Sequence, residues 1–302
     1  MAPEAVRAKK QHIASTKPTT ENLRAAGGAA KQQKNGLNFI FYRLGAKVLT
    51  GNVDLYLIYY GTWADSEKQL IETFANGIGT SGWYNTTKQY YFQQNQNSGK
   101  IMVNGTVKVK QTVTDTGSLG FTLGATDIAK IVNGNINNDT FPADTNAIYY
   151  VLTSDNVKES MDSSNRFCTN YCGYHGSTIA NKNNTRVQYS MVGKPPPSCF
   201  GACAASLNSK VSPNSNVAVD ALLSVFAHEL TEAVTDPYGD MSGKEAWYDQ
   251  KGYENGDKCS WNFGTVKKDT FGASYNVEIS NKKWLVQLNW SPVSQSCVLK
   301  TN

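Results

Sequence analysis

Six cysteines constrain this chain more than any other feature of its sequence, and they stand at Cys168, Cys172, Cys199, Cys203, Cys259 and Cys297. An even number that includes two closely spaced pairs is typical either of disulfides or of a metal cage. A zinc knuckle usually has two residues between paired cysteines, whereas both pairs here have three, so we favour disulfides. The spacing alone does not give the connectivity. We prefer a Cys259–Cys297 bridge, with the other four cysteines bridged among themselves.

Disulfides form in oxidising compartments, so we expect a secreted protein, either extracellular or held in a cell wall. Four Asn-x-Thr triplets fit N-glycosylation and point to the same compartment; they begin at Asn85, Asn104, Asn138 and Asn183. No apolar stretch approaches the length of a membrane span. The net charge of +5 is mild and the basic residues are scattered, which argues against a nucleic-acid partner.

The composition changes near residue 37. Residues 1–36 contain almost no large apolar side chain and cannot bury enough surface to offset the entropy of ordering them. We therefore expect a flexible tail, or the remnant of a pro-segment, followed by one domain over residues 37–302.

Strands and helices are expected to alternate within this domain. Hydrophobic periodicity predicts strands at 53–60, 106–113, 147–152 and 186–192, and helices at 65–76, 126–132 and 217–235. Two further β-segments, at 275–279 and 284–288, are expected in an irregular C-terminal part. The alternation predicts an α/β domain with a mixed sheet and a disulfide-rich irregular part.

The helix at 217–235 carries the residues with the clearest chemistry. His228 and Glu232 are four residues apart, so they project from the same helix face and can bind one ion. In zinc peptidases with the motif His-Glu-x-x-His, a Glu placed like Glu229 accepts a proton from the metal-bound water. Here Glu232 replaces the second His, and a short pattern like this also arises by chance on a solvated helix face. The apolar turns before His228 favour a buried helix, whose His and two Glu would need a cation.

Acidic residues after this helix are candidates for a third ligand. Glu254 and Asp257 compete for the role, although an ordinary polar turn would show the same residues. Asp236 is interpreted as part of the turn that ends the helix. His175, next to Gly176, is a candidate fourth ligand or a donor to a developing oxyanion; a structural His bonded to a backbone carbonyl is an equal alternative.

Several segments resemble the EXORDIUM, or phosphate-induced, protein family. The resemblance is carried by residues 51–63, by the cysteine segments 167–176 and 197–203, and by shorter matches up to Cys297, so that it covers about residues 37–299. It implies a secreted, cell-wall-associated protein linked to growth and brassinosteroid responses, without a settled enzymatic activity.

The plant members of the family differ from this chain at the helix motif. They lack the His-Glu pair, and the chain looks closer to microbial relatives with His-Glu-x-x-Glu-Ala-x-Thr-Asp-Pro, here residues 228–237. The acid that matches Glu254 persists in the plant branch, whereas the one that matches Asp257 does not. This comparison favours Asp257 as the third ligand.

The order of elements is similar to that of the zincin peptidases, with the strand at 186–192 as the edge strand. We therefore expect a single zincin-like α/β domain with a twisted mixed sheet and a long metal-site helix. The expected function is zinc-dependent hydrolysis of extracellular protein or peptide. The expected metal ligands are His228, Glu232 and either Asp257 or Glu254. Glu229 is the expected general base, and His175 is a candidate oxyanion donor.

Two other functions stay open. In the first, the protein is a non-enzymatic extracellular or cell-wall protein with a structural ion, for which calcium is the alternative to zinc. In the second, it binds cell-wall polysaccharide through exposed aromatic side chains such as Trp83, Tyr84, Tyr90 and Tyr91.

Overall fold

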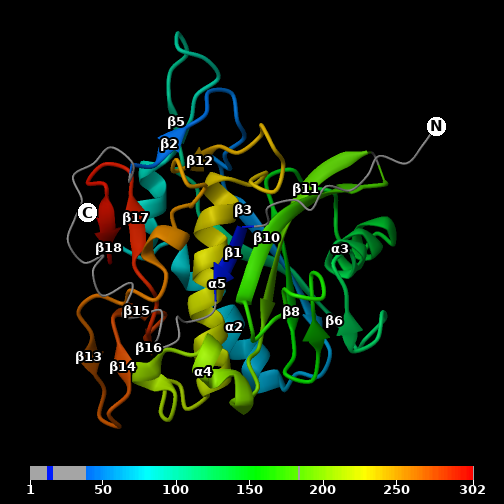
Figure 1. Cartoon of the computed structure of the whole chain (residues 1–302), viewed down its shortest axis with the longest axis vertical. Coiled ribbons are helices and arrows are strands. Elements are labelled where there is room, and N and C mark those ends of the chain that lie inside the picture. Colours follow the sequence, from blue (N-terminus) through cyan, green and yellow to red (C-terminus); the bar gives the residue numbers. More distant parts are fainter. Residues whose placement is uncertain (1–11, 16–38, 183, 302) are drawn as a thin grey trace.

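A six-stranded sheet in the order β1-β10-β11-β8-β3-β6 organises the protein (Figure 1). The computed structural model describes residues 12–15, 39–182 and 184–301, the first of these ranges by its backbone alone. β6, β3, β8 and β11 run parallel, whereas β10 is antiparallel to β11 and β1 is antiparallel to β10. The strands span His12–Ser15 (β1), Val53–Tyr60 (β3), Val107–Asp115 (β6), Ile148–Thr153 (β8), Tyr171–Ala180 (β10) and Thr185–Gly193 (β11).

The inner parallel strands owe their position to unbroken apolar runs. β8 is buried at every residue, and β3 at all but Asp54. A parallel strand covered on both faces has no polar side to present, so such runs belong in the middle of a sheet. β6 alternates instead between buried or half-buried and exposed residues along much of its length, as expected of an edge strand.

Three helices cover the sheet on its two faces (Figure 1). α5 (Val217–Thr235) and α2 (Asp65–Ile78) lie on one face, and α3 (Asp127–Asn137) packs against β8, β10 and β11 on the other. The side chain of Asn216 caps α5 by accepting a hydrogen bond from the Val219 amide. Most residues of α5 are buried, so this helix is enclosed rather than amphipathic.

Short elements fill the rest of the domain. The minor strand pairs are β2 (Phe41–Tyr42) with β12 (Trp247–Tyr248), β4 (Tyr91–Phe92) with β5 (Ile101–Met102), β7 (Thr122–Leu123) with β9 (Lys158–Glu159), β13 (Lys267–Lys268) with β14 (Ser274–Tyr275), β15 (Val277–Ile279) with β16 (Lys282–Trp284), and β17 (Asn289–Ser291) with β18 (Ser296–Val298). The short helices are η2 (Tyr84–Gln89), η3 (Pro197–Cys199), α4 (Phe200–Cys203), η4 (Ser206–Asn208) and η5 (Asp257–Cys259).

All six cysteines are paired, which confirms the prediction of disulfides. The preferred Cys259–Cys297 bridge is present and ties η5 to β18. The other four cysteines bridge among themselves, as Cys168–Cys199 and Cys172–Cys203. These two bridges fasten the start of β10 to the short helices η3 and α4.

The predicted α/β class with a mixed sheet is confirmed, and α5 has the expected bounds. α3, however, continues to Asn137 instead of ending at 132. The expected edge strand at 186–192 corresponds to β11, which is an inner strand, since β10 lies beyond it. In the C-terminal part, β16 ends at Trp284, so the strand expected at 284–288 is wrong over 285–288.

No strand was predicted at the position of β10, because its glycines and polar residues have a low strand propensity. One of these glycines is required by packing. A Cβ at Gly173 would lie 2.7 Å from Val225 Cγ1 and 2.9 Å from the Met191 carbonyl oxygen, so only glycine lets α5 approach the sheet here.

The predicted flexible tail, residues 1–36, is described only at 12–15. There the backbone forms β1, which extends the sheet beyond β10 and pairs His12 with His175 in register. The rest of the tail lies outside the described residues. Among the residues described, no helix has the length and apolar character to cross a membrane.

Glu159 is a buried carboxyl group far in sequence from the helix motif. It is 4% exposed and accepts hydrogen bonds from the hydroxyl groups of Tyr171 and Tyr174 on β10. Burial raises the pKa of Glu159 from 4.5 to about 7, and the two tyrosine hydrogen bonds only partly oppose this rise.

Glu159 should therefore make the protein less stable as the pH rises from 4.5 to 7. In this window the unfolded chain has released the proton and the folded chain keeps it, so the free energy of unfolding falls by up to about 3 kcal/mol. The change is complete above pH 7. Glu159→Gln cannot ionise, and its urea unfolding between pH 4.5 and 8 should lack this part of the decline. Glu278→Gln, at an exposed position of β15, is the control, and a Glu159→Gln profile parallel to wild type would contradict the assignment.

Candidate metal centre

α5 carries its three charged motif residues into the interior. His228 is 1% exposed, and Glu229 and Glu232 are fully buried. A buried carboxylate costs several kcal/mol unless it is paired or hydrogen-bonded. The partners of these side chains therefore determine what the centre can do.

The first group of facing side chains joins α5 to η5. His228 Nε2 lies 3.1 Å from Glu232 Oε1 and 3.6 Å from Asp257 Oδ1. The backbone amide of Asp257 also donates a hydrogen bond to Glu232 Oε1, with a separation of 2.9 Å. Since Cys259 of η5 is bridged to Cys297, the turn that carries Asp257 is covalently anchored to β18. His228, Glu232 and Asp257 together could hold a metal ion.

A second group lies on the other side of Glu232. His175 Nε2, from β10, is 2.9 Å from Glu254 Oε2 and 3.7 Å from Glu232 Oε2. All three side chains are fully buried, and they too could hold a metal ion. Asp257 and Glu254, expected to compete for one position, thus belong to different groups that share the Glu232 carboxylate.

Glu229 is close to these groups without belonging to either. Its Oε1 lies near Gly173 of β10, where an added Cβ would come within 3.2 Å. Among the described residues, neither carboxyl oxygen of Glu229 has a hydrogen-bond partner. Burial raises the pKa of Glu229 well above its ordinary value, and the adjacent His228 only partly opposes this.

The carboxylates also act on the two histidines. Burial by itself would lower the pKa of His175, but Glu254 and Glu232 reverse this effect and raise the pKa to about 9. In the same way, Glu232 and Asp257 outweigh burial and raise the pKa of His228 well above its usual range. The surroundings thus favour positive charge at both imidazole rings.

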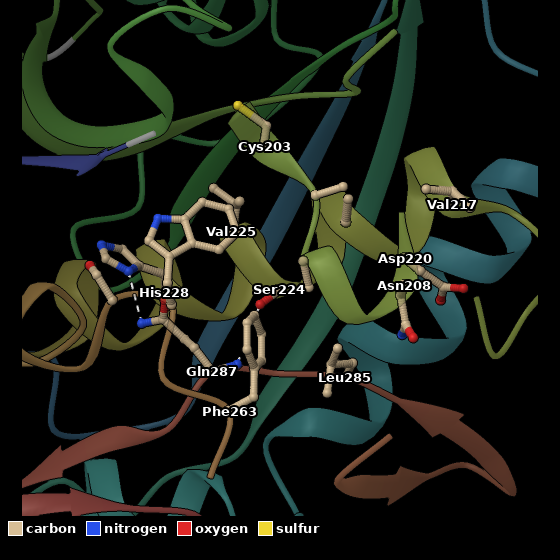
Figure 2. Close-up of a pocket in the computed structure, with 15 residues that line it drawn as sticks. Cys203, Asn208, Val217, Asp220, Ser224, Val225, His228, Phe263, Leu285 and Gln287 are labelled. Atoms are coloured by element: carbon tan, nitrogen blue, oxygen red, sulfur yellow. Dashed lines mark hydrogen bonds between the residues drawn. The ribbon is translucent and has the colours of Figure 1, made fainter. Parts of the chain in front are cut away.

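Sequence reasoning missed two residues that shape the centre. The side-chain amide of Gln287 forms a hydrogen bond with His228 Nδ1, 2.9 Å away (Figure 2). It also donates a hydrogen bond to the Gly256 carbonyl. If a cation binds His228 Nε2, the ring proton must be on Nδ1. The side-chain oxygen of Gln287 can accept a hydrogen bond from that N–H group if the amide turns by 180°. The amide nitrogen then loses its hydrogen bond to Gly256. A Cβ at Gly256 would lie 2.8 Å from Glu232 Oε1, so glycine is needed there. Gln287 carries no recognisable motif signal, and Gly256, which lies between the candidate ligands Glu254 and Asp257, was given no role of its own.

A crevice runs along α5 and reaches His228 (Figure 2). Ser224 and Val225 of the helix form one wall, and Phe263 and Leu285 contribute to the other. Phe263 and Leu285 are largely buried, so the crevice is apolar over much of its length. Gln287 lies beside His228 at its end.

The remaining site predictions have mixed outcomes. Asp236 is part of the turn after α5, as expected, and its Oδ1 accepts a hydrogen bond from the Ala246 amide. The exposure predicted for aromatic side chains is wrong for Trp83, Tyr84 and Tyr90, which are at most 1% exposed, whereas Tyr91 is half-buried. Trp83 instead donates a hydrogen bond to the Gln287 carbonyl and packs inside the domain.

Seven curated proteins match most of this chain, and all are named EXORDIUM, EXORDIUM-like or PHOSPHATE-INDUCED. Protein EXORDIUM-like 3 of Arabidopsis thaliana is 29% identical, over 93% of this chain and 89% of its own length. Protein PHOSPHATE-INDUCED 1 of Nicotiana tabacum is 26% identical, over 85% of this chain and 86% of its own length. No solved structure matches the chain.

These comparisons overturn the predicted zinc peptidase. The relatives are EXORDIUM and phosphate-induced proteins, and none of them is named as a peptidase or hydrolase. The roles assigned to Glu229 as general base and to His175 as oxyanion donor lose their basis with it. The chemical reason for the error is that a short His-Glu motif specifies ligands and not a reaction. The zincin-like fold likewise has no solved structure to support it.

The resemblance seen in the sequence is confirmed over nearly the whole domain. The conserved region of phosphate-induced protein 1 matches residues 41–300, a span that includes the cysteines, the whole of α5 and every residue of both facing groups. The chain therefore belongs to the phosphate-induced, or EXORDIUM, protein family.

Proposed function

We propose that this chain is an extracellular protein of EXORDIUM type in which the buried His–carboxylate centre holds a divalent cation with a structural role. Family membership and three disulfides support an oxidising, extracellular location. Two of the predicted glycosylation sites, Asn104 and Asn138, are exposed, which agrees with this location. The His-Glu-x-x-Glu motif places the chain nearest to a microbial-type branch of the family, and this too is a proposal.

We assign a structural role to the cation because its ligands are buried. A catalytic cation keeps an open coordination position for water or substrate, whereas a structural cation is enclosed by its ligands. Here His228 and Glu232 are at most 1% exposed, and the side chain of Asp257 is 11% exposed. A cation among them would connect α5 to the η5 turn and add its binding free energy to the stability of the folded state.

The donor atoms narrow the choice of ion. Calcium prefers a shell of six to eight oxygens, and imidazole nitrogen suits zinc and other first-row transition metals. Because His228 is placed to supply a nitrogen, zinc is our first candidate and calcium the second. Both ions fall within the proposed structural role.

Loss of Glu232 should remove the cation. Glu232→Gln neutralises the carboxylate common to both groups, so metal retained through extensive dialysis should fall from at least one ion per wild-type chain to less than 0.2. The thermal midpoint should no longer respond to chelator. Metal content by mass spectrometry and differential scanning fluorimetry provide the readouts.

Asp220→Asn is the matched control for this experiment. Asp220 is a buried acid on the same helix, about two turns before His228, and it pairs with Asn214 instead of facing the centre. This variant should keep wild-type metal content. A wild-type protein that carries no zinc or calcium and melts at the same temperature with and without chelator would refute the proposed function.

Removal of the buried Glu229 carboxyl should stabilise the metal-free protein. Its two oxygens lack hydrogen-bond partners among the described residues, and an unpaired buried polar group costs about 1–3 kcal/mol. In chelator, Glu229→Leu should therefore be more stable than wild type by about that amount, measured by urea unfolding. Glu278→Leu, at an exposed position of β15, should change the stability little. Since Glu229 belongs to neither group, metal content should persist. Loss of metal in Glu229→Leu would show that Glu229 is itself a ligand.

A further inference from the structure

We infer that the centre binds two divalent cations, with the Glu232 carboxylate as the bridge between them. This inference rests on the proposed function and extends it, because that proposal requires only one ion. The first ion would lie between His228, Glu232 and Asp257. The second would lie between His175, Glu232 and Glu254.

The two oxygens of Glu232 face in different directions. Oε1 is 3.1 Å from His228 Nε2, and Oε2 is 3.7 Å from His175 Nε2. A single ion near His228 would use Oε1 and leave His175 and Glu254 on the far side of the carboxylate. Two ions, one on each oxygen, use both groups in full.

Spacings within each group suit a metal shell. Donor atoms bound at 2.0–2.2 Å to a tetrahedral ion are about 3.3–3.6 Å from one another. From His228 Nε2, the distances to the acidic oxygens are 3.1 and 3.6 Å. From His175 Nε2, they are 2.9 and 3.7 Å. The histidine-to-oxygen distances thus lie within about 0.4 Å of the range expected for a tetrahedral ion.

A buried carboxylate oxygen without a hydrogen bond points into this space. Glu232 Oε2 has no hydrogen bond among the described residues and is 3.7 Å from His175 Nε2, although its side chain is fully buried. Buried polar atoms are nearly always satisfied in folded proteins, and a missing ion is one reason for an exception. The unpartnered Oε2 is on the side of the second group, which favours a second ion.

The two groups share Glu232 and are otherwise built from different elements. His228 and Asp257 come from α5 and η5, and His175 and Glu254 come from β10 and the residues just before η5. Each ion can therefore be removed by its own variant. His175→Ala should remove only the second, and His228→Ala only the first.

Zinc stoichiometry tests this inference directly. Wild-type protein stripped with chelator, refilled with Zn²⁺ and freed of excess by gel filtration should retain two ions per folded chain. His175→Ala and His228→Ala should each retain one, and the control Asp220→Asn should retain two. His175→Gln serves as a second variant if His175→Ala does not fold.

Proximity of the ions gives an independent readout. Metals that share a carboxylate are about 3.5–4 Å apart, close enough for paramagnetic ions to couple. In wild-type protein, the electron paramagnetic resonance signal per Co²⁺ should be weaker at two equivalents than at one. In His175→Ala, the signal should saturate at one equivalent without this loss.

The outcomes separate the two proposals. Two retained ions with coupled signals support both. One retained ion in wild type overturns the dinuclear centre and leaves the structural cation standing. Two retained ions without coupling, or two ions still present in His175→Ala, also overturn the bridge. No retained ion overturns both proposals.

Discussion

The enclosure of α5 is the constraint on which the rest of this structure depends. A helix that is apolar on nearly every side cannot lie on a protein surface, so the sheet, α2, η2 and the C-terminal segments all have to pack around it. The same enclosure brings His228, Glu229 and Glu232 into the interior along with the apolar residues. The burial that stabilises the apolar side chains of this helix therefore also removes its charged side chains from water, which costs electrostatic free energy.

The cost of burying these charged side chains explains several otherwise unrelated features of the chain. Gly173 and Gly256 allow the sheet and the η5 turn to approach the helix closely enough for polar side chains to meet. The Cys259–Cys297 bridge holds the turn in place, and Gln287 fixes the ring of His228 from the crevice side. A cation bound between these elements would relieve the repulsion among the carboxylates, which links local geometry to the stability of the whole domain.

Much of this arrangement could be predicted from the sequence, and the exceptions have physical reasons. Long apolar runs and the cap of α5 are local signals, so β3, β8 and α5 were predictable, and the pairing of helix residues four apart placed His228 beside Glu232. The position of β10 could not be predicted, because its glycines serve contacts with α5 that only the fold reveals. The burial of Trp83 and Tyr90 depends likewise on distant C-terminal residues. The reaction was mispredicted because ligand spacing does not encode chemistry.

The position of β1 affects how copies of this protein meet. One margin of the sheet, β6, carries Lys108 and Lys110, and charged side chains discourage the addition of another strand. At the other margin, the backbone of β1 covers the first half of the ten-residue strand β10, from Tyr171 to His175. Displacement of β1 would uncover a row of hydrogen-bonding groups on β10. Such a row is a template on which another chain can add a strand, so the pairing of β1 with β10 bears on whether copies of this protein stay separate.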